Sequence, residues 1–159
     1  MDMTWSEGEI DGCIIAPFTK YSDNRGWLAE IFRSDELPGD VFPRMGYISQ
    51  TDPGRARGPH EHEHQTDLFA FCDGSYRVYL WDDREDSKTY GKRIVLSSGT
   101  ENPMIVIIPP GVVHAYQNVG DRPALVINCP SRLYGGEGRS EAVDEIRHED
   151  RSDQRFSMD

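Results

Sequence analysis

The stretch Gly58-Pro59-His60-Glu61-His62-Glu63-His64-Gln65-Thr66-Asp67 contains three of the five histidines of this 159-residue chain. Successive side chains of a β-strand point to opposite faces, so this spacing allows His60, His62 and His64 to share one face. An isolated run of alternating His and Glu is equally compatible with a solvated polar strand. A second segment, Pro109-Pro110-Gly111-Val112-Val113-His114, carries a fourth histidine and changes that balance.

The rest of the chain consists of short apolar runs separated by Gly, Pro, Asn and Asp, which is typical of a β-sandwich or barrel. The expected strands are Ile14–Phe18, Trp27–Phe32, Tyr47–Gln50, Leu68–Cys72, Tyr76–Trp81, Arg93–Leu96, Met104–Ile108, His114–Asn118 and Ala124–Asn128. Met104–Ile108 is apolar on both faces, which predicts a central strand. Asp73-Gly74 predicts a hairpin, and a helix is expected only over Ser140–His148.

The length of the chain predicts one domain over residues 1–159. Within it we expect an N-terminal strand or arm over residues 1–22. Much of the acidic excess lies in residues 137–159, which predicts a charged, solvated C-terminal tail.

The chain has 17 Lys and Arg against 28 Asp and Glu, a formal net charge of −11. This balance argues against nucleic acid or an anionic membrane as the main partner. A phosphorylated small molecule remains compatible, because a few arginines reverse the charge locally. No apolar leader begins the chain and no apolar run approaches the ~18 residues of a membrane helix. With Cys13, Cys72 and Cys129 interpreted as free thiols, the expected location is the cytoplasm.

The two histidine segments together resemble the paired motifs of the cupins. The matching positions are Gly58, His60, His62, Asp67 and Gly74, followed by Pro109, Gly111, His114 and Asn118. The resemblance implies an all-β, cupin-type jelly roll, a β-barrel or sandwich, with a short polar C-terminal segment. It implies that His60, His62 and His114 face the barrel interior. One alternative is therefore a metal-dependent cupin enzyme that holds Fe, Mn, Ni or Zn with these three histidines and Asp67.

A narrower resemblance, from about Asp23 to Glu137, is to the dTDP-4-dehydrorhamnose 3,5-epimerase family. It is carried by Asp23-x-Arg25-Gly26 with Glu30, Arg57-Gly58-x-His60, Gln65-x-x-Leu68, Asp82-x-Arg84-x-x-Ser87-x-Thr89-Tyr90-Gly91, Leu96-Ser97, and Ile108-Pro109-x-Gly111-x-x-His114. The family acts on nucleotide-linked 4-keto-6-deoxyhexoses, needs no metal, and dimerises by strand exchange near the N-terminus. The resemblance thus implies a homodimer, no cofactor, a nucleotide-sugar ligand, and a role in polysaccharide biosynthesis.

The family's chemistry requires a base that removes a proton next to a ketone, and a neutral histidine suits this task. The resemblance makes His60 that base and Arg25 and Arg57 the contacts to the diphosphate. His114 matches a second active-site histidine, and Tyr134 is expected as a further catalytic residue of the pocket. The remaining expected substrate-binding residues are Glu30, Gln65, Asp67, Tyr116 and Asn128.

Three departures from the family pattern bear on activity. Asp67 stands where the family has an active-site Lys, and Asn128 stands where it has a proton-donating Tyr. The acidic residue that polarises the catalytic histidine has no match. We therefore expect very low activity on the family's usual substrate, unless Asp67 is protonated, paired with an Arg or bound to a metal. A protein that binds a sugar nucleotide without turning it over is a third alternative.

Overall fold

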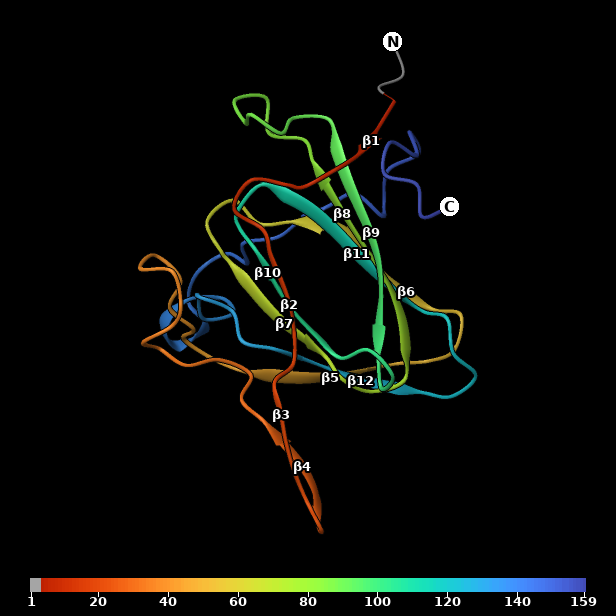
Figure 1. The fold of residues 1–159 in the computed structure, drawn as a ribbon. Helices are drawn as coiled ribbons and strands as arrows, with labels where there is room; N and C mark the ends of the chain where they lie inside the picture. The colour runs from red at the N-terminus through yellow and green to blue at the C-terminus, as the bar shows by residue number, and fades with distance from the viewer. Residues whose placement is uncertain (1–3) are drawn as a thin grey trace.

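The computed structural model describes residues 4–159, so the first three residues of the expected arm lie outside the described part. Two β-sheets pack face to face (Figure 1). Sheet A contains, in spatial order, β1 (Ser6–Glu7), β9 (Lys92–Gly99), β8 (Ser75–Asp82), β11 (Val112–Asn118), β6 (Ala56–Glu61) and β13 (Ile146–Arg147). Sheet B contains β2 (Ile14–Pro17), β10 (Met104–Ile108), β7 (Asp67–Phe71), β12 (Ala124–Asn128) and β5 (Tyr47–Thr51). The predicted all-β jelly-roll fold is confirmed.

The main core lies between the two sheets. Phe69, Phe71 and Val106 of sheet B meet Val78, Leu80 and Tyr116 of sheet A, and all six are buried. As its composition predicted, β10 lies inside its sheet, between β2 and β7. Apolar burial of this kind is the main driving force for folding and fixes which face of each strand turns inward.

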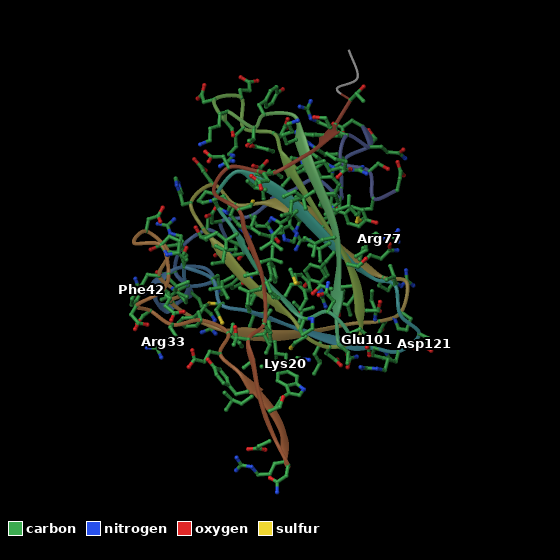
Figure 2. The ribbon with its side chains drawn as sticks, viewed as in Figure 1. Lys20, Arg33, Phe42, Arg77, Glu101 and Asp121 are labelled. Atoms are coloured by element: carbon green, nitrogen blue, oxygen red, sulfur yellow. The ribbon has the colours of Figure 1, made fainter. Side chains whose placement is uncertain are left out.

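A third, two-stranded sheet forms an arm that projects away from the sandwich (Figure 1). It consists of β3 (Lys20–Asp23) and β4 (Gly26–Ala29), paired antiparallel. Tyr21, Trp27 and Leu28 of the arm are exposed in the single chain. Figure 2 shows Lys20 at its base, and the Lys20 ammonium lies 4.7 Å from the centroid of the Trp27 ring. An isolated two-stranded hairpin is marginally stable in water, and exposed apolar surface of this kind is typical of interaction sites.

The pairing of β6 with β11 positions the histidine cluster. His60 and His114 are direct partners across this antiparallel pair, and the register shifts between His114 and Tyr116. Gly58 allows the close approach: its φ is +85°, and a Cβ there would lie 2.5 Å from the His114 carbonyl oxygen. The two motif segments are therefore neighbouring strands, as the cupin resemblance implied.

The expected hairpin at Asp73-Gly74 is wrong. The turn joins β7 of sheet B to β8 of sheet A, so the strands on either side of it do not pair. The Asp73 carboxylate accepts hydrogen bonds from the Arg122 guanidinium and from the Leu125 backbone N–H. These contacts hold the turn against the loop between β11 and β12. The chain crosses from sheet B to sheet A at this turn.

The C-terminal segment, residues 137–159, differs from both expectations for it. The predicted helix over Ser140–His148 is absent: the one helical element within residues 4–159 is a short 3-10 turn at Glu137–Arg139, and β13 pairs with β6. The segment is not a solvated tail, because Phe156 packs on Trp81 and Trp5 over the outer face of sheet A. The apolar stripe of Ala142, Val143 and Ile146 was too thin to hold a helix against these contacts.

The family-specific string around Asp82 is structural. Arg84, Ser87 and Thr89 all donate hydrogen bonds to the Asp82 carboxylate and close the connection between β8 and β9. None of the four lines the cavity described below. No helix in residues 4–159 has the length and apolar character needed to cross a membrane.

Candidate functional site

A cavity of about 770 Å³ opens at one end of the sandwich. Its walls come from β5, β6, β11 and the segment that follows β12. Its lining residues from the strands and the histidine motif include Tyr47, Ser49, Arg57, His60, His62, Gln65, Phe69 and Tyr116. The C-terminal segment supplies the opposite wall, including Arg132, Tyr134, Arg139, Asp144, Glu145 and Arg147. The volume is in the range of sites that hold a drug-sized or nucleotide-sized ligand.

Three histidines cluster at one wall of this cavity: His60 and His62 line it, and His114 lies directly behind them. The ring centroids of His60 and His114 lie 4.5 Å apart, and His62 lies 5.7 Å from each of them. His64 does not join them: β6 ends at Glu61, and the His64 side chain is exposed beside Glu63. The alternation that suggested a shared face therefore holds for His60 and His62 only.

Asp67 lies beneath the histidines and is almost completely buried. Its Oδ1 accepts hydrogen bonds of 2.9 Å from Gln65 Nε2 and from Asn128 Nδ2. Its Oδ2 lies 3.0 Å from His62 Nε2 and 3.2 Å from His114 Nε2. Neither histidine contact has hydrogen-bond geometry, so Asp67 Oδ2 and His114 Nε2 have no hydrogen-bond partner in the described part of the chain.

The other ring nitrogens fix how the histidines are protonated. Nδ1 of His114 lies 3.0 Å from the Val112 carbonyl oxygen, and Nδ1 of His62 contacts the Asp144 carbonyl oxygen. A carbonyl only accepts, so both Nδ1 atoms carry hydrogen and both Nε2 atoms face Asp67. Burial alone lowers the pKa of His62, but Asp67 outweighs burial and raises this pKa to about 9. Burial likewise opposes ionisation of Asp67, yet His114 and His62 hold its pKa well below the usual range.

His60 has the opposite electrostatic environment. Burial, followed by the neighbouring His114 and His62, lowers the pKa of His60 to about 2, so the ring is neutral. Its Nδ1 lies 3.8 Å from a Glu145 carboxylate oxygen. Glu145, immediately before β13, thus places a carboxylate beside His60, although the sequence offered no match for the family's acidic residue. His60 and this carboxylate both line the cavity.

Asn128 connects Asp67 to β5. Its Oδ1 accepts a hydrogen bond of 3.1 Å from the Leu68 backbone N–H. Its Nδ2 donates to Asp67 Oδ1 and, at 3.1 Å, to the Tyr47 hydroxyl oxygen. Asn128 is buried, so it acts on the cavity through these neighbours.

The structure brings most of the predicted site residues together. Arg57, His60, His62, Gln65, Tyr116 and Tyr134 line the cavity, while Asp67, His114 and Asn128 lie directly behind its wall. Arg25 and Glu30 do not reach the cavity of their own chain. Arg25 is exposed at the tip of the arm, paired with Asp23, and Glu30 faces Arg33 beyond the end of β4.

Sequence reasoning missed Tyr47, Asp144 and Glu145. The alternation of Tyr47, Ser49 and Thr51 along β5 was a usable signal for an inward face. Asp144 and Glu145 gave no such signal, because they lie in an irregular segment. Asp144 accepts hydrogen bonds from the backbone N–H groups of Glu63, His64 and Gln65 at 2.8–2.9 Å. This clamp holds the C-terminal segment against the histidine motif.

The residues present also fit a divalent metal ion. The ligand atoms of His60, His62 and His114 all lie within 4.8 Å of one another. Asp67 Oδ2 and His114 Nε2 are buried acceptors without hydrogen-bond partners, and a cation satisfies such a set. Carbonyl oxygens behind Nδ1 of His62 and His114 are a usual outer-shell arrangement of metal-bound histidines. Such an ion would polarise a carbonyl or acidify a water.

The fold and cavity define a jelly-roll protein with a histidine-lined, ligand-sized site. The sequence profile of the family described as dTDP-4-dehydrorhamnose 3,5-epimerase matches residues 7–151, and the chain belongs to that family. It is 40% identical to the spore coat polysaccharide biosynthesis protein SpsL of Bacillus subtilis, over 79% of this chain and 82% of that protein. It is also 40% identical to the probable low-salt glycan biosynthesis epimerase Agl13 of Haloferax volcanii, over 76% and 78% of the two chains.

A solved structure shows the same fold. The dTDP sugar isomerase from Desulfovibrio desulfuricans G20 is 28% identical to this chain and superposes with a TM-score of 0.74. The similarity covers 87% of this chain and 84% of that one.

Proposed function

We propose that this protein is an isomerase that epimerises a nucleotide-linked 4-keto-6-deoxyhexose in the synthesis of a surface glycan. The observation that carries this proposal is the pair formed by His60 and Glu145, a neutral imidazole in the cavity wall with a carboxylate beside it. Family membership supports the reaction class. The two curated relatives are named for polysaccharide and glycan biosynthesis, which supports the pathway.

In the proposed reaction His60 removes a proton from the carbon next to the ketone, and the electron pair of that C–H bond forms an enolate. The low pKa of His60 keeps the ring in its free-base form at every cellular pH. An anionic substrate brings negative charge beside the ring, which raises the pKa of His60 toward the value that a base requires. The Glu145 carboxylate then stabilises the imidazolium that forms.

The carboxylate at position 67 does not present an uncompensated negative charge to the enolate. Its charged neighbours are His62 and His114. From the sequence we expected activity only if Asp67 is protonated, paired with an Arg or bound to a metal. The positive His62 ring and Asp67 compensate each other behind the cavity wall. Asp67, which stands where the family has a Lys, therefore supports the histidines instead of contacting substrate.

Arginines of the cavity supply sites for a diphosphate. The Arg57 guanidinium is held by hydrogen bonds to Thr51 Oγ1 and the Gln50 carbonyl oxygen. Arg132, Arg139 and Arg147 line the opposite wall. Guanidinium groups match phosphate oxygens in geometry and charge. The same lining also contains Glu137, Glu141, Asp144, Glu145 and Glu149, so the arginines supply local cationic sites in a cavity of mixed charge.

We also propose a homodimer in which the arm reaches a second copy. The exposed Tyr21, Trp27 and Leu28 support this assembly, since at least half of each residue's surface faces solvent in the single chain. It would also explain why Arg25 lies away from its own cavity. We propose the cytoplasm as the location, because Cys13, Cys72 and Cys129 are free thiols.

Proton exchange tests the reaction. Incubation with a dTDP-, UDP- or GDP-linked 4-keto-6-deoxyhexose in heavy water should place deuterium on the carbon next to the ketone, as measured by NMR. His60→Ala should abolish exchange, and the matched control His64→Ala should leave it unchanged, because His64 lies outside the cavity. Tight binding of these compounds without exchange would instead identify a non-catalytic binding protein.

A metal-dependent enzyme is the second candidate, favoured by the two buried acceptors without hydrogen-bond partners. Elemental analysis of protein purified without added metal tests it directly. Stoichiometric Fe, Mn, Ni or Zn that is lost in the His62→Ala and His114→Ala variants would support this candidate. Metal-free protein that exchanges the substrate proton at full rate would exclude a metal requirement.

A further inference from the structure

Tyr47 presents an unused hydroxyl hydrogen to the cavity. It lies directly opposite Asn128 in the antiparallel pair of β5 and β12. Its hydroxyl oxygen accepts the hydrogen bond from Asn128 Nδ2, so its own hydrogen is free to bond elsewhere. Within residues 4–159 no acceptor is placed to receive this hydrogen. Tyr47 lines the cavity, so a bound molecule is the available acceptor.

The position of Tyr47 follows from the alternation along β5. Tyr47, Ser49 and Thr51 face the interior, where they contact Asn128, Tyr116 and the Arg57 guanidinium respectively. Ile48 between them is exposed on the outer face of the sheet. The strand thus aims the phenol inward, and the Asn128 amide, itself held by Leu68 and Asp67, fixes where the hydroxyl lies.

His60 and Tyr47 belong to opposite sheets. His60 is on β6 of sheet A, and Tyr47 is on β5 of sheet B. Both side chains line the cavity of about 770 Å³, and they enter it from opposite sheets. A sugar enolate bound between the two sheets in this cavity would present one face to His60 and the other to Tyr47. Inversion of a carbon centre requires this arrangement, because the proton must return from the face opposite to the one it left.

We propose that Tyr47 is the catalytic acid of the epimerisation. The family has its proton-donating Tyr at the position of Asn128, and Tyr47 lies directly across the β5–β12 strand pair from that position. The inference rests on the proposed function. His60 takes the proton from the carbon next to the ketone, and the C–H electron pair forms the enolate. Tyr47 then donates its hydroxyl proton to the same carbon from the opposite face. The resulting phenolate and imidazolium recover their starting states by exchange with water.

The other tyrosines of the cavity suit this role less well. The Tyr116 ring packs among Phe69, Phe71 and Tyr76, and its hydroxyl faces Ser49 at 3.5 Å. Tyr134 lies on the segment after β12 and is 62% exposed, without a side chain that fixes its hydroxyl. Tyr47 is 42% exposed, yet burial raises its pKa to about 12, so it carries its proton throughout the physiological range.

Separate measurement of exchange and inversion tests the proposal. In heavy water, Tyr47→Phe should still incorporate deuterium at the carbon next to the ketone, because His60 is intact. Inversion at that carbon should fall by a factor of ~100 or more, the usual contribution of a positioned acid. Proton return from the His60 face then yields labelled substrate of unchanged configuration. Tyr90→Phe, which changes an exposed tyrosine outside the cavity, is the matched control and should keep both rates.

Three outcomes would overturn the inference. Inversion by Tyr47→Phe at the parental rate would exclude Tyr47 as the acid while leaving the proposed function standing, and so would loss of inversion in Tyr134→Phe alone. Absence of exchange in the parent would remove the proposed function and this inference with it. Substitution of 3,5-difluorotyrosine at position 47 keeps the hydroxyl but lowers its pKa. The alkaline limb of the inversion rate should move to lower pH, which a structural role of Tyr47 would not produce.

Discussion

The carboxylate of Glu145 lies 3.8 Å from Nδ1 of His60, although the two residues are 85 positions apart in the sequence. The contact exists because β13, which begins at the next residue, pairs with β6 and places Arg147 opposite His60. A short strand pairing thus completes the catalytic position. The proposed base and its acidic neighbour depend on a segment that has no regular sequence pattern.

Glu145→Gln should slow proton exchange by about 10- to 100-fold, because the imidazolium formed on His60 loses its counter-charge. The fold should be unaffected, since the Glu145 side chain is partly exposed and its other partner is the surface residue Arg147. Deuterium incorporation measured by NMR gives the rate, and thermal unfolding gives the stability. The matched control Glu101→Gln, at an exposed residue outside the cavity, should be neutral. An unchanged exchange rate in Glu145→Gln would show that His60 needs no carboxylate.

The ion pair of His62 and Asp67 should make stability depend on pH in metal-free protein. The folded-state pKa of His62 is raised to about 9 from 6.5, so its contribution is complete below pH 6.5 and is lost as pH rises through about 9. A shift of this size corresponds to about 3 kcal/mol. The pKa of Asp67 is lowered, so its contribution is present at neutral pH and is lost only in acid.

Urea unfolding between pH 6.5 and 9.5 measures this alkaline loss. His62→Gln should be less stable than the parent at pH 6.5 and should show a flatter pH dependence above it. His64→Gln, which changes an exposed histidine, should reproduce the parental curve. A parent whose stability is constant across this range would contradict the pairing.

Restoring the family's residues should damage the fold. Asp67→Lys would bury an ammonium group between His62 and His114 and leave Gln65 and Asn128 without their acceptor. Breaking a buried pair in this way typically costs about 3–5 kcal/mol. Adding Asn128→Tyr would force a ring into a buried site that already contacts Tyr47. Denaturant unfolding of the double variant should show this loss, whereas parental stability would mean that the site adapts.

The sequence predicted the features that depend on local pattern. Alternating apolar residues located the strands, and the two histidine segments placed His60 and His114 on neighbouring strands. The outward turn of His64 was not predictable, because it depends on β6 ending at Glu61. Beyond that residue, the backbone N–H groups of Glu63 and His64 donate hydrogen bonds to the Asp144 carboxylate. Asp144 is distant in the sequence, so strand alternation alone wrongly placed His64 on the same face as His60 and His62.

The errors at Asp73-Gly74 and at Ser140–His148 have a common cause. The Asp73-Gly74 pattern was interpreted as a hairpin and the Ser140–His148 pattern as a helix, and both interpretations considered the segment alone. In the structure, both segments make contacts with elements that are distant in the sequence. The turn crosses between sheets, and the C-terminal segment covers sheet A and walls the cavity. Tyr47 and Glu145 were missed for the same reason, since their importance arises from partners across a sheet.

The arm should hold a dimer together. Tyr21, Trp27 and Leu28 form an exposed apolar surface on a hairpin that lies away from the core. Replacing Trp27 and Leu28 by Ser should shift the protein from dimer to monomer in light scattering at micromolar concentration. Phe42→Ser is the control, because Phe42 is an exposed residue elsewhere on the surface (Figure 2). A parent that is already monomeric would contradict the proposed assembly.

The Asp144 clamp should control whether the cavity wall is closed. Its carboxylate accepts hydrogen bonds from the backbone N–H groups of Glu63, His64 and Gln65, and its backbone carbonyl oxygen contacts His62. Asp144→Ala removes the three acceptor contacts and leaves the backbone contact to His62 in place. The C-terminal segment should then detach more often, because loss of several hydrogen bonds to a charged group costs about 1.5–3 kcal/mol each before compensation by water.

Limited proteolysis measures that detachment. In Asp144→Ala, cleavage should increase selectively at Arg139 and Arg147, the basic residues of the released wall, while Arg77 in β8 stays protected. Asp150→Ala, a change at an exposed acidic residue of the same segment, should cleave like the parent. The exchange rate should fall together with the increase in cleavage, because Glu145 leaves His60 when the segment opens. Faster cleavage with an unchanged exchange rate would separate the clamp from the chemistry and would show that His60 functions without the wall.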